Sequence, residues 1–442
     1  MTLLLKRFKG LIGVVLFFSA VLWLSAGGAH KHLLAGTDKT YEELNIFSDV
    51  LDIIETNYVD PVDSKKLVRG AIQGMLNSLD PHSIFLTPEA YKELQIDTRG
   101  EFGGIGIVIT MQDNVVTVIS PIDGSPAHKA GIKAGDQIIR VDGEETKNLK
   151  LWEAVKKMRG KKGTKVVITV KRKGLAEPRD FTVVRDVIPL ESVRSHVLKP
   201  GYGYVRITNF RDNTFDDVRA ALKKLESGKI LLKGLILDLR DNPGGLLDQA
   251  VKVADIFLDK GRIVSIRGRS KAHSKTYSAS SDEEKHPYPV VILVNEGSAS
   301  AAEIVAGALQ DHDRALILGA VSFGKGSVQA VEPLSDGSGL KLTIARYYTP
   351  KGRTIQARGI IPDVVVRERL LPESQTRKQG RVKEKDLKNH ISAKPQEKMP
   401  EELKKEEIKL IPGVKVPGQE PPGVVQELLA KDNQVRRALE VL

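Results

Sequence analysis

The sequence contains no cysteine and few aromatic residues. None of its 442 residues is Cys, and Phe, Trp and Tyr together make up 5%. The absence of Cys excludes disulfides, thiolate metal sites, Fe–S clusters, a cysteine nucleophile and a lipid-modified N-terminal Cys. The nine His residues show no HExxH or similar ligand spacing. We therefore predict neither a metal site nor a metal-dependent reaction.

The charge of the chain is unbalanced toward the basic side. Lys and Arg number 68 against 56 Asp and Glu, which gives a net charge of +12. A nucleic-acid-binding protein is therefore one alternative, but we find no aromatic-plus-basic motif of the kind that stacks bases. We interpret the excess as a solvated basic surface and expect no nucleic-acid partner. With 41% hydrophobic residues the chain can bury a core, so wholesale disorder is excluded.

The first 29 residues have the pattern of an export signal. Lys6, Arg7 and Lys9 precede a charge-free apolar run over 11–26, and small residues follow it. This order is typical of a secretory signal, and the run is shorter than the roughly 20 residues of a spanning helix. We predict a signal peptide or an uncleaved signal anchor over 1–29. The expected location is the bacterial periplasm or the outer face of the inner membrane.

Hydrophobic periodicity and composition divide the rest of the chain into five parts. Apolar residues recur at helical spacing, then alternate as in strands, and then form strand-length runs separated by helical patterns. Farther along, Lys, Glu, Gln and Pro dominate before helical spacing returns. The parts are a helical unit (37–96), a β-rich domain (97–187), an α/β core (188–368), a charged Pro-containing linker (369–422) and a C-terminal helix (423–442). The apolar stripe of the last helix predicts packing on a second subunit, hence a homodimer or higher homo-oligomer.

A glycine-rich stretch opens the β-rich domain. Gly103-Gly104-Ile105-Gly106-Ile107 is followed by GSPAHKAGIKAGDQIIRVDG over 124–143. Together these segments resemble a PDZ domain over about Glu101 to Val187. Such a loop offers successive backbone N–H groups to a carboxylate, and the following strand edge accepts a peptide. The resemblance implies peptide binding by residues 103–107, and it implies that Arg159 senses occupancy of the groove. The alternative is a glycine-permitted turn without a ligand.

A serine and a lysine stand in two motifs of the α/β region. Ser300 lies in NEGSASAAEI, between an apolar strand pattern and a helical pattern, and Lys325 follows in SFGKGSVQ. A serine nucleophile needs a base, and no His has a triad-like context. Lys325 is the natural candidate, because burial can keep a lysine neutral. Gln329 lies four residues beyond it, where it could hold the amine.

Backbone N–H groups near Ser300 are candidates for an oxyanion hole. The N–H of Ala301 stands at the start of the helical pattern, where it would point at a developing oxyanion. The motif DLRDNPGG ends another buried strand, and its Gly244 or Gly245 could supply the second donor.

Several long motifs in order resemble the carboxyl-terminal processing proteases, serine peptidases of the tail-specific type. They are DLRDNPGGLL, NEGSASAAEI, FGKGSVQ and ARYYTPKGRTIQ followed by GIIPD, within roughly 41–366. The resemblance implies a multidomain α/β fold: a ClpP/crotonase-like α/β protease core, a β-rich PDZ domain and a small N-terminal helical unit. It makes Ser300 the nucleophile, Lys325 the general base and Gln329 the orienting residue, with no cofactor. The chain departs from the family at Ala302, where a third serine is usual.

These motifs allow four other interpretations. Ser300 and Glu303 form a capping-box pattern, in which the serine oxygen only caps a helix. Ser298 is a competing nucleophile. Lys325 invites a P-loop interpretation, which fails because Gly326 stands where Ser or Thr is required. His312 is a candidate triad histidine, but it lies at the polar end of the helical pattern.

The sequence therefore predicts an exported serine endopeptidase with a Ser–Lys dyad. Its PDZ domain would recognise the free C-termini of protein or peptide substrates. The main alternative is a membrane-tethered PDZ adaptor with an inactive protease core.

Overall fold

The computed structural model describes residues 39–112, 115–122, 124–147, 149, 151–280, 286–368, 382–392 and 423–442. The predicted signal segment and most of the predicted linker lie outside these residues. The chain forms two compact units, residues 1–76 and residues 77–442. In the described part of the chain, no helix is long and apolar enough to cross a membrane.

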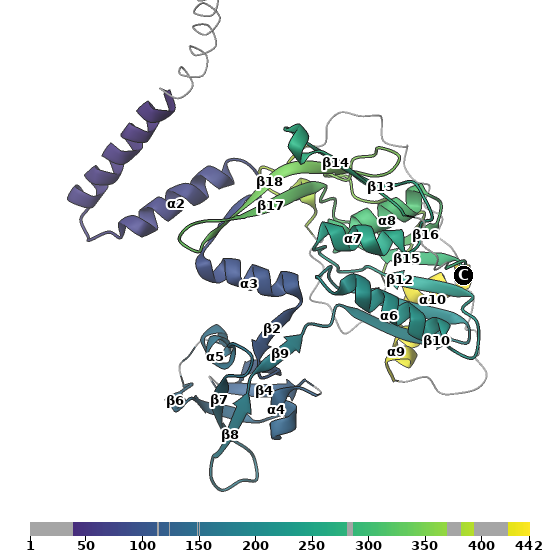
Figure 1. Cartoon of the computed structure of the whole chain (residues 1–442), viewed down its shortest axis with the longest axis horizontal. Coiled ribbons are helices and arrows are strands. Elements are labelled where there is room, and N and C mark those ends of the chain that lie inside the picture. The colour runs from purple at the N-terminus through teal and green to yellow at the C-terminus, as the bar shows by residue number, and fades with distance from the viewer. Residues whose placement is uncertain are drawn as a thin grey trace, which may run out of the picture. The chain divides into compact units, whose positions relative to one another are not determined.

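The described part of the first unit is helical. A helix over 39–57 precedes α2 (Ser64–Asn77) (Figure 1). Asp63 stands just before α2, and its Oδ1 accepts the N–H groups of Lys65 and Lys66 at 2.9 and 3.3 Å. These two N–H groups belong to the first turn of α2, where backbone N–H groups have no hydrogen-bond partner inside the helix. Many apolar side chains of the 39–57 helix are exposed, among them Val50 at 48%.

A six-stranded sheet forms the centre of the α/β core. Its order is β10-β11-β12-β15-β16-β19, and every neighbouring pair except β10–β11 is parallel. β12 reads GLILD and β15 reads VVILV, and all ten residues are buried. Continuous apolar runs of this kind are typical of strands covered on both faces. The strands are β10 (Val193–Lys199), β11 (Tyr202–Ile207), β12 (Gly234–Asp238), β15 (Val290–Val294), β16 (Ala315–Gly319) and β19 (Val364–Val365).

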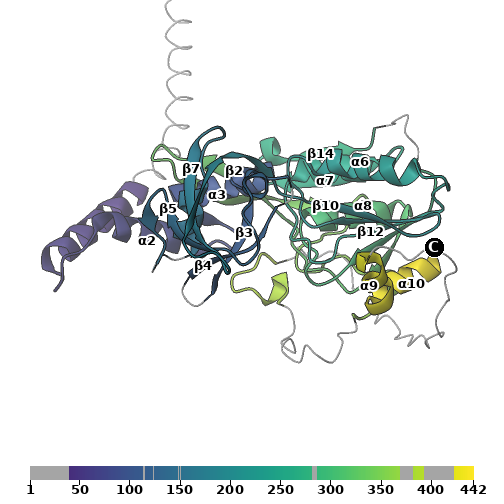
Figure 2. The same ribbon diagram turned by 90° about the horizontal axis from the view of Figure 1, so that it is seen from below.

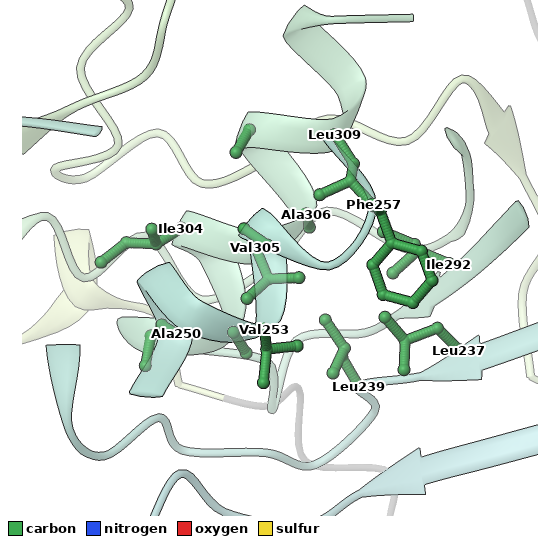
Figure 3. Close-up of a cluster of buried hydrophobic side chains, with 14 of the residues drawn as sticks. Leu237, Leu239, Ala250, Val253, Phe257, Ile292, Ile304, Val305, Ala306 and Leu309 are labelled. Carbon is green, nitrogen blue, oxygen red and sulfur yellow. The ribbon is translucent and has the colours of Figure 1, made fainter. Parts of the chain in front are cut away.

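Three helices cover one face of this sheet. They are α6 (Thr214–Glu226), α7 (Leu247–Asp255) and α8 (Ala301–Asp311). Leu237 and Leu239 from β12 and the turn after it meet Val253 of α7 and Val305 of α8 in the main hydrophobic cluster (Figure 3). Ten of the eleven residues of α8 are buried, so this helix is fixed within the core.

Two short helices cover the other face. α9 (Gly423–Lys431) and α10 (Asn433–Val441) lie on the side of the sheet away from α6 and α7 (Figure 2). The prediction of one continuous helix over 423–442 is wrong, because Asp432 interrupts it and caps α10. Val425 and Val435 pack on Ile236 of the sheet. The apolar stripe is therefore buried inside the chain, and the argument that it needs a second subunit no longer holds.

An antiparallel sheet lies beside the core. β18 pairs with β1, β13 and β17, and β13 also pairs with β14. The strand β1 comes from the segment predicted as purely helical, and it leads into α3, which ends at Gly100 with a φ of 74°. The elements are β1 (Ile84–Leu86), α3 (Pro88–Arg99), β13 (Arg262–Gly268), β14 (Lys275–Ser278), β17 (Ser327–Pro333) and β18 (Gly339–Tyr348).

The β-rich domain is a six-stranded antiparallel sheet with two short helices. Its order is β3-β4-β5-β7-β8 with β6 on β5, so β3 is an edge strand. A second pair, β2–β9, joins the two ends of the domain. The elements are β2 (Glu101–Gly104), β3 (Ile107–Gln112), β4 (Val115–Pro121), α4 (Pro126–Ala130), β5 (Gln137–Val141), β6 (Glu144–Glu145), α5 (Leu151–Met158), β7 (Lys165–Lys171), β8 (Arg179–Val184) and β9 (Asp186–Pro189).

Part of the predicted linker packs on the core. Residues 382–392 contain a short 3-10 helix, η2 (Glu384–Asp386), and the Glu384 side chain is completely buried. Composition alone predicts a solvated linker here, because charged residues dominate. The prediction is wrong for this stretch because the buried Glu384 carboxylate forms hydrogen bonds with His82 and Gln356.

Candidate active site

The predicted site residues lie at the carboxyl ends of three adjacent parallel strands. β12 leads to the glycines at 244 and 245, β15 leads to Ser300, and β16 leads to Lys325. Because neighbouring parallel strands end at the same edge of a sheet, the three loops meet there. The fold thus brings together segments that are up to 81 residues apart in the sequence, from Gly244 to Lys325.

Ser300 occupies a strained position at the start of α8. Its backbone has φ 54° and ψ −112°, outside the regions that a serine ordinarily adopts, and its exposed fraction is 8%. Strain of this kind persists only where the surroundings enforce it, and it clusters at functional sites. Here the Ser300 N–H donates to Glu303 Oε2 at 2.8 Å.

The capping-box interpretation accounts for only part of this geometry. Glu303 accepts the Ser300 N–H, as in a capping box, and the Glu303 N–H donates to the Ser300 carbonyl oxygen at 2.9 Å. Among the described residues, the Ser300 hydroxyl makes no cap hydrogen bond. Burial raises the pKa of the nearby Tyr347 hydroxyl, and Ser300 acts on that pKa in the opposite direction. The hydroxyl is thus available to a role other than capping.

Glu303 joins the Ser300 turn to the Lys325 loop. Its Oε2 accepts the Lys325 N–H at 2.9 Å as well as the Ser300 N–H, and its Oε1 accepts from Ser322 Oγ and the Gly324 N–H at 2.5 and 2.8 Å. The carboxylate is completely buried. Burial raises the pKa of Glu303 to about 7, although these hydrogen bonds act to lower it.

Lys325 is a lysine whose environment favours the neutral amine. Burial lowers its pKa to about 8, and the positive charge of Lys341 acts in the same direction. The carboxylates of Glu384, Glu303 and Asp80 oppose that change. Among the contacts of the described residues, no hydrogen bond joins Lys325 Nζ to Ser300 Oγ. The two predicted members of the dyad are thus in neighbouring loops, with their side chains not yet engaged.

Gln329 lies on β17 and has partners other than the lysine. Its Nε2 donates to Ser327 Oγ at 2.8 Å and to Thr343 Oγ1 at 3.4 Å. Thr343 in turn donates to Asp80 Oδ1 at 3.1 Å. A direct hold of Gln329 on the Lys325 amine is therefore not present in this structure.

The geometry distinguishes between the two glycines predicted for the oxyanion hole. The Gly244 N–H donates to Asn242 Oδ1 at 2.8 Å and is occupied. Within the described chain, the N–H groups of Gly245 and Ala301 have no hydrogen-bond partner. A Cβ added at Gly244 would lie 2.7 Å from Ser300 Cβ, which shows how closely the glycine turn approaches the serine. Gly245 and Ala301 are therefore the available pair of donors.

The predicted peptide-binding loop is only partly open. Gly103 and Gly104 belong to β2, where they pair with Val187 and Asp186 of β9. The backbone from Ile105 to Ile107 leads into the edge strand β3, which has β4 on one side. An edge strand presents unpaired N–H and C=O groups to which a peptide can add.

Arg159 stands just after α5 and contacts the connecting helix α3. Its Nη1 donates to both carboxylate oxygens of Glu93, at 2.7 and 2.6 Å, and its guanidinium lies 4.8 Å from the centre of the Phe102 ring. Arg159 thus links the end of α5 to α3.

Comparisons with known proteins cover nearly the whole chain. Residues 201–366 match Peptidase family S41, residues 103–183 match the PDZ domain, and residues 11–90 match the activating protease CtpB N-terminal domain. The chain is 46% identical to the carboxy-terminal-processing protease of Bartonella bacilliformis over 390 residues, which are 87% of this chain and 89% of that protein. The chain belongs to the carboxy-terminal processing proteases of peptidase family S41.

A second relative agrees with this assignment. The chain is 41% identical to the carboxy-terminal processing protease CtpA of Bacillus subtilis over 328 residues, which are 74% of this chain and 69% of that protein. The solved photosystem II D1 C-terminal processing protease is 33% identical and covers 73% of this chain and 92% of its own, with a TM-score of 0.42. The predicted family, the multidomain α/β fold and the serine peptidase activity are confirmed.

The contacts of Ser298 and His312 give both residues a structural role in the protease. Ser298 is completely buried, and its hydroxyl donates to the Leu239 carbonyl oxygen at 2.8 Å while accepting the Asn295 N–H at 3.0 Å. It holds the loop together. His312 caps the far end of α8, where its Nε2 lies 2.7 Å from the Arg262 carbonyl oxygen. Because α8 rises about 1.5 Å per residue, His312 is far from Ser300.

A buried charge network lies just before the glycine turn at 244–245, and the sequence motifs did not predict it. Arg240 donates to Asp238 Oδ1 from Nε at 2.9 Å and to Gln434 Oε1 from Nη1 at 2.9 Å, and its Nη2 lies 2.7 Å from Asp432 Oδ2. Burial alone would raise the pKa of Asp238, but Arg240 outweighs it and holds that pKa below its ordinary value. The DLR motif carried a signal for Asp238 and Arg240. Nothing in the sequence pointed to their partners on α10.

Proposed function

We propose that this protease is exported, captures the free C-terminus of an extended protein chain through its PDZ domain, and cleaves that chain with a Ser300–Lys325 dyad. One observation carries the dyad: Lys325 is a half-buried lysine with a pKa of about 8, in a loop fastened to the same carboxylate as Ser300. A base with a pKa near the working pH is suited to accept the serine proton.

The acylation half of the reaction uses three groups of the site. Ser300 Oγ attacks the scissile carbonyl carbon while its proton passes to the neutral Lys325 Nζ. The N–H groups of Gly245 and Ala301 stabilise the oxyanion, which forms where two unpartnered donors face it. The carbon–nitrogen bond then breaks, and the Lys325 ammonium returns the proton to the leaving amine. An ester between Ser300 and the acyl part of the substrate remains.

The deacylation half repeats the same steps with water. Lys325 accepts a proton from the attacking water, and the tetrahedral intermediate again places its oxyanion against the two N–H groups. As the intermediate collapses, the bond from its carbon to Ser300 Oγ breaks and the Lys325 ammonium returns its proton to that oxygen, which leaves the Ser300 hydroxyl and a new carboxyl terminus. For this cycle the lysine side chain must come within hydrogen-bonding reach of Ser300 Oγ, so substrate binding has to draw the two side chains together.

The PDZ domain supplies specificity for the end of the substrate chain. Backbone N–H groups between Ile105 and Ile107 would bind the terminal carboxylate, and the substrate would add as a strand to β3. The pair between Arg159 and Glu93 links the end of α5 to the helix that leads to the protease core, which supports a role for Arg159 in reporting occupancy. The substrates are protein tails that end in small or apolar residues.

Export and self-association complete the proposal. Residues 1–29 would direct the chain to the periplasm and tether it to the inner membrane if they stay attached. A fusion of these residues to a phosphatase that is active only outside the cytoplasm should be active. The exposed apolar side chains of the 39–57 helix, including Phe47 and Val50, support a homodimer or higher homo-oligomer. Replacing both with serine should then give a smaller species in sedimentation.

The experiment that tests the catalytic part compares two peptides and two proteins. An unstructured peptide with an apolar free C-terminus, and its C-terminal amide, are incubated with the full chain and with Ser300→Ala. We expect cleavage by the wild type alone, and faster cleavage of the free acid. Equal cleavage by both proteins would reduce Ser300 to a helix cap. Tight binding of the free acid without cleavage by either protein would instead favour the adaptor function.

A matched pair of glycine variants tests the PDZ part. At Gly106 φ is 75° and an added Cβ would lie 2.4 Å from Ser125 Cβ, whereas at Gly124 φ is 72° and nothing lies within 4 Å. Gly106→Ala should raise KM for the free acid toward that of the amide and leave turnover of the amide unchanged. Gly124→Ala carries the same backbone strain and should leave the preference for the free acid intact.

A further inference from the structure

A short C-terminal segment is bound against the loop of the general base. We call residues 382–392 the strap. Its Glu384 side chain is completely buried, with one carboxylate oxygen 2.7 Å from His82 Nε2 and the other accepting from Gln356 Nε2 at 2.8 Å. A carboxylate is rarely found fully buried unless it is paired. The strap is therefore held by a specific polar site.

The strap is linked to both sides of Lys325 along the chain, directly on one side and through Gln356 on the other. The Glu384 N–H donates to the Phe323 carbonyl oxygen at 3.3 Å, two residues before the lysine. Gln356, which donates to Glu384, also accepts the Gly326 N–H at 2.9 Å through its Oε1. The strap and the lysine loop thus share a continuous set of hydrogen bonds.

A second segment reaches the same place from the N-terminal side. His82 pairs with Glu384, and the nearby Asp80 accepts the N–H groups of His82 and Ser83 at 2.8 and 3.0 Å. Asp80 also accepts from Thr343, which is a partner of Gln329. The segment at 80–83 and the strap therefore meet next to the elements that carry Lys325 and Gln329.

We infer that Glu384 is a positioning residue for the general base: the strap fastens the 322–326 loop and places a buried negative charge beside the Lys325 amine. His82 pairs with that charge and holds the carboxylate in place. This inference rests on the proposed role of Lys325, and it makes the strap part of the active site rather than a linker.

The charges that face Lys325 fix the sign of the expected effect. Lys341 on β18 acts with burial to favour the neutral amine. Glu384 on η2, Glu303 on α8 and Asp80 before β1 favour the ammonium form. Removing the charge of Glu384 should therefore move the ionisation of Lys325 to lower pH.

The experiment measures the ionisation of Lys325 without using catalysis. Acetylation of the folded full chain by a brief pulse of acetic anhydride is followed at Lys325 by mass spectrometry across pH. Glu384→Gln should shift the labelling midpoint down by about one pH unit, the size expected for loss of one nearby opposite charge. Asp386→Asn removes an exposed carboxylate from the same turn and should leave the midpoint unchanged.

A double variant keeps the test decisive if the single one does not fold. His82→Gln with Glu384→Gln replaces the pair by two neutral side chains that can still bond to each other, which avoids an unpaired buried charge. It should show the same downward shift. An unchanged midpoint in the folded Glu384 variants would overturn the inference.

Peptide cleavage measured across pH on the same proteins separates this inference from the dyad. Cleavage and labelling that shift together support both. A labelling midpoint that shifts while the cleavage profile does not would leave the strap in place and refute Lys325 as the base. A wild-type cleavage profile that follows Lys325, with no shift in the variants, would refute the strap alone.

Discussion

Ser300 and Lys325 donate their backbone N–H groups to a single atom, Glu303 Oε2, at 2.8 and 2.9 Å. The turn at Ser300 and the loop at Lys325 are thus fixed to each other through one buried carboxylate. The other oxygen of that carboxylate binds Ser322 and Gly324, so the whole loop before Lys325 depends on it. Glu303, which was expected only to cap a helix, is thus linked to the positions of both residues of the proposed dyad.

Glu303→Gln should lower kcat by about 100-fold with little change in KM, because loss of precise placement costs rate more than binding. An amide offers one acceptor oxygen to four donors, so at least two of them lose their partner. Glu296→Gln is the control, since it removes a half-buried carboxylate near Ser300 and leaves all four donors in place. A Glu303 variant with normal kcat would show that the shared carboxylate is not needed for placement.

Lys341→Met should move the pH profile of kcat upward. The wild-type rate should rise with pH through a midpoint of about 8, as the Lys325 amine loses its proton. Lys341 lowers the pKa of Lys325. Its removal therefore raises that pKa and moves the rising limb of the profile to higher pH. Lys351→Met, which removes an exposed lysine, should not move the limb. A profile governed by a group near pH 6.5, the ordinary range of histidine, would refute the lysine base.

Lys325→Met should abolish cleavage and stabilise the fold. The folded protein holds the pKa of Lys325 at about 8 instead of 10.5, so below pH 8 the buried ammonium opposes folding. The wild-type free energy of unfolding therefore rises with pH between these two values. At pH 7 the variant should gain about 1–3 kcal/mol, allowing for partial exposure of the side chain. Urea unfolding at pH 7 and pH 10 checks this, and the gain should shrink at the higher pH.

Gly244→Ala should inactivate the enzyme through direct crowding of the nucleophile. The added Cβ would lie 2.7 Å from Ser300 Cβ, at a backbone φ of 104° that only glycine adopts readily. Gly352→Ala is the matched control, because φ there is 82° with nothing within 4 Å. Both should lose about 1–2 kcal/mol of stability from backbone strain, and only the first should lose activity. Equal activity of the two variants would separate this glycine turn from the site.

Features of the site that lie within one sequence motif could be predicted, whereas contacts between distant segments could not. Ser300, Lys325 and the glycine turn lie in motifs that follow strand-length apolar runs, so their meeting at one sheet edge could be predicted. Glu303 was expected only as a cap, because its bonds to Ser322 and Gly324 come from another loop. Glu384 and Asp80 carry no periodic signal and sit in polar stretches. Their roles depend on packing between distant segments.

The C-terminal helices show the same limit of prediction: the sequence indicates which residues are buried but not what they pack against. The apolar spacing of Val425, Val435 and Leu439 correctly predicts a buried stripe, but it cannot say which surface covers it. The answer lies in Ile236, Leu293 and Leu318, which point to the second face of the sheet. Asp432 was unremarkable in the sequence, yet it begins α10 and pairs with Arg240.

Because α9 and α10 cover this face of the sheet, both the solubility and the activity of the enzyme depend on them. A copy clipped before Gly423 would lose both helices at once. Arg240, just after β12, would lose Asp432 and Gln434, and the apolar face around Ile236 would be open to water. Such a face on parallel strands promotes aggregation. Loss of these two helices would thus cause aggregation and disturb the active site together. No soluble, active fragment would then remain to cleave other proteins.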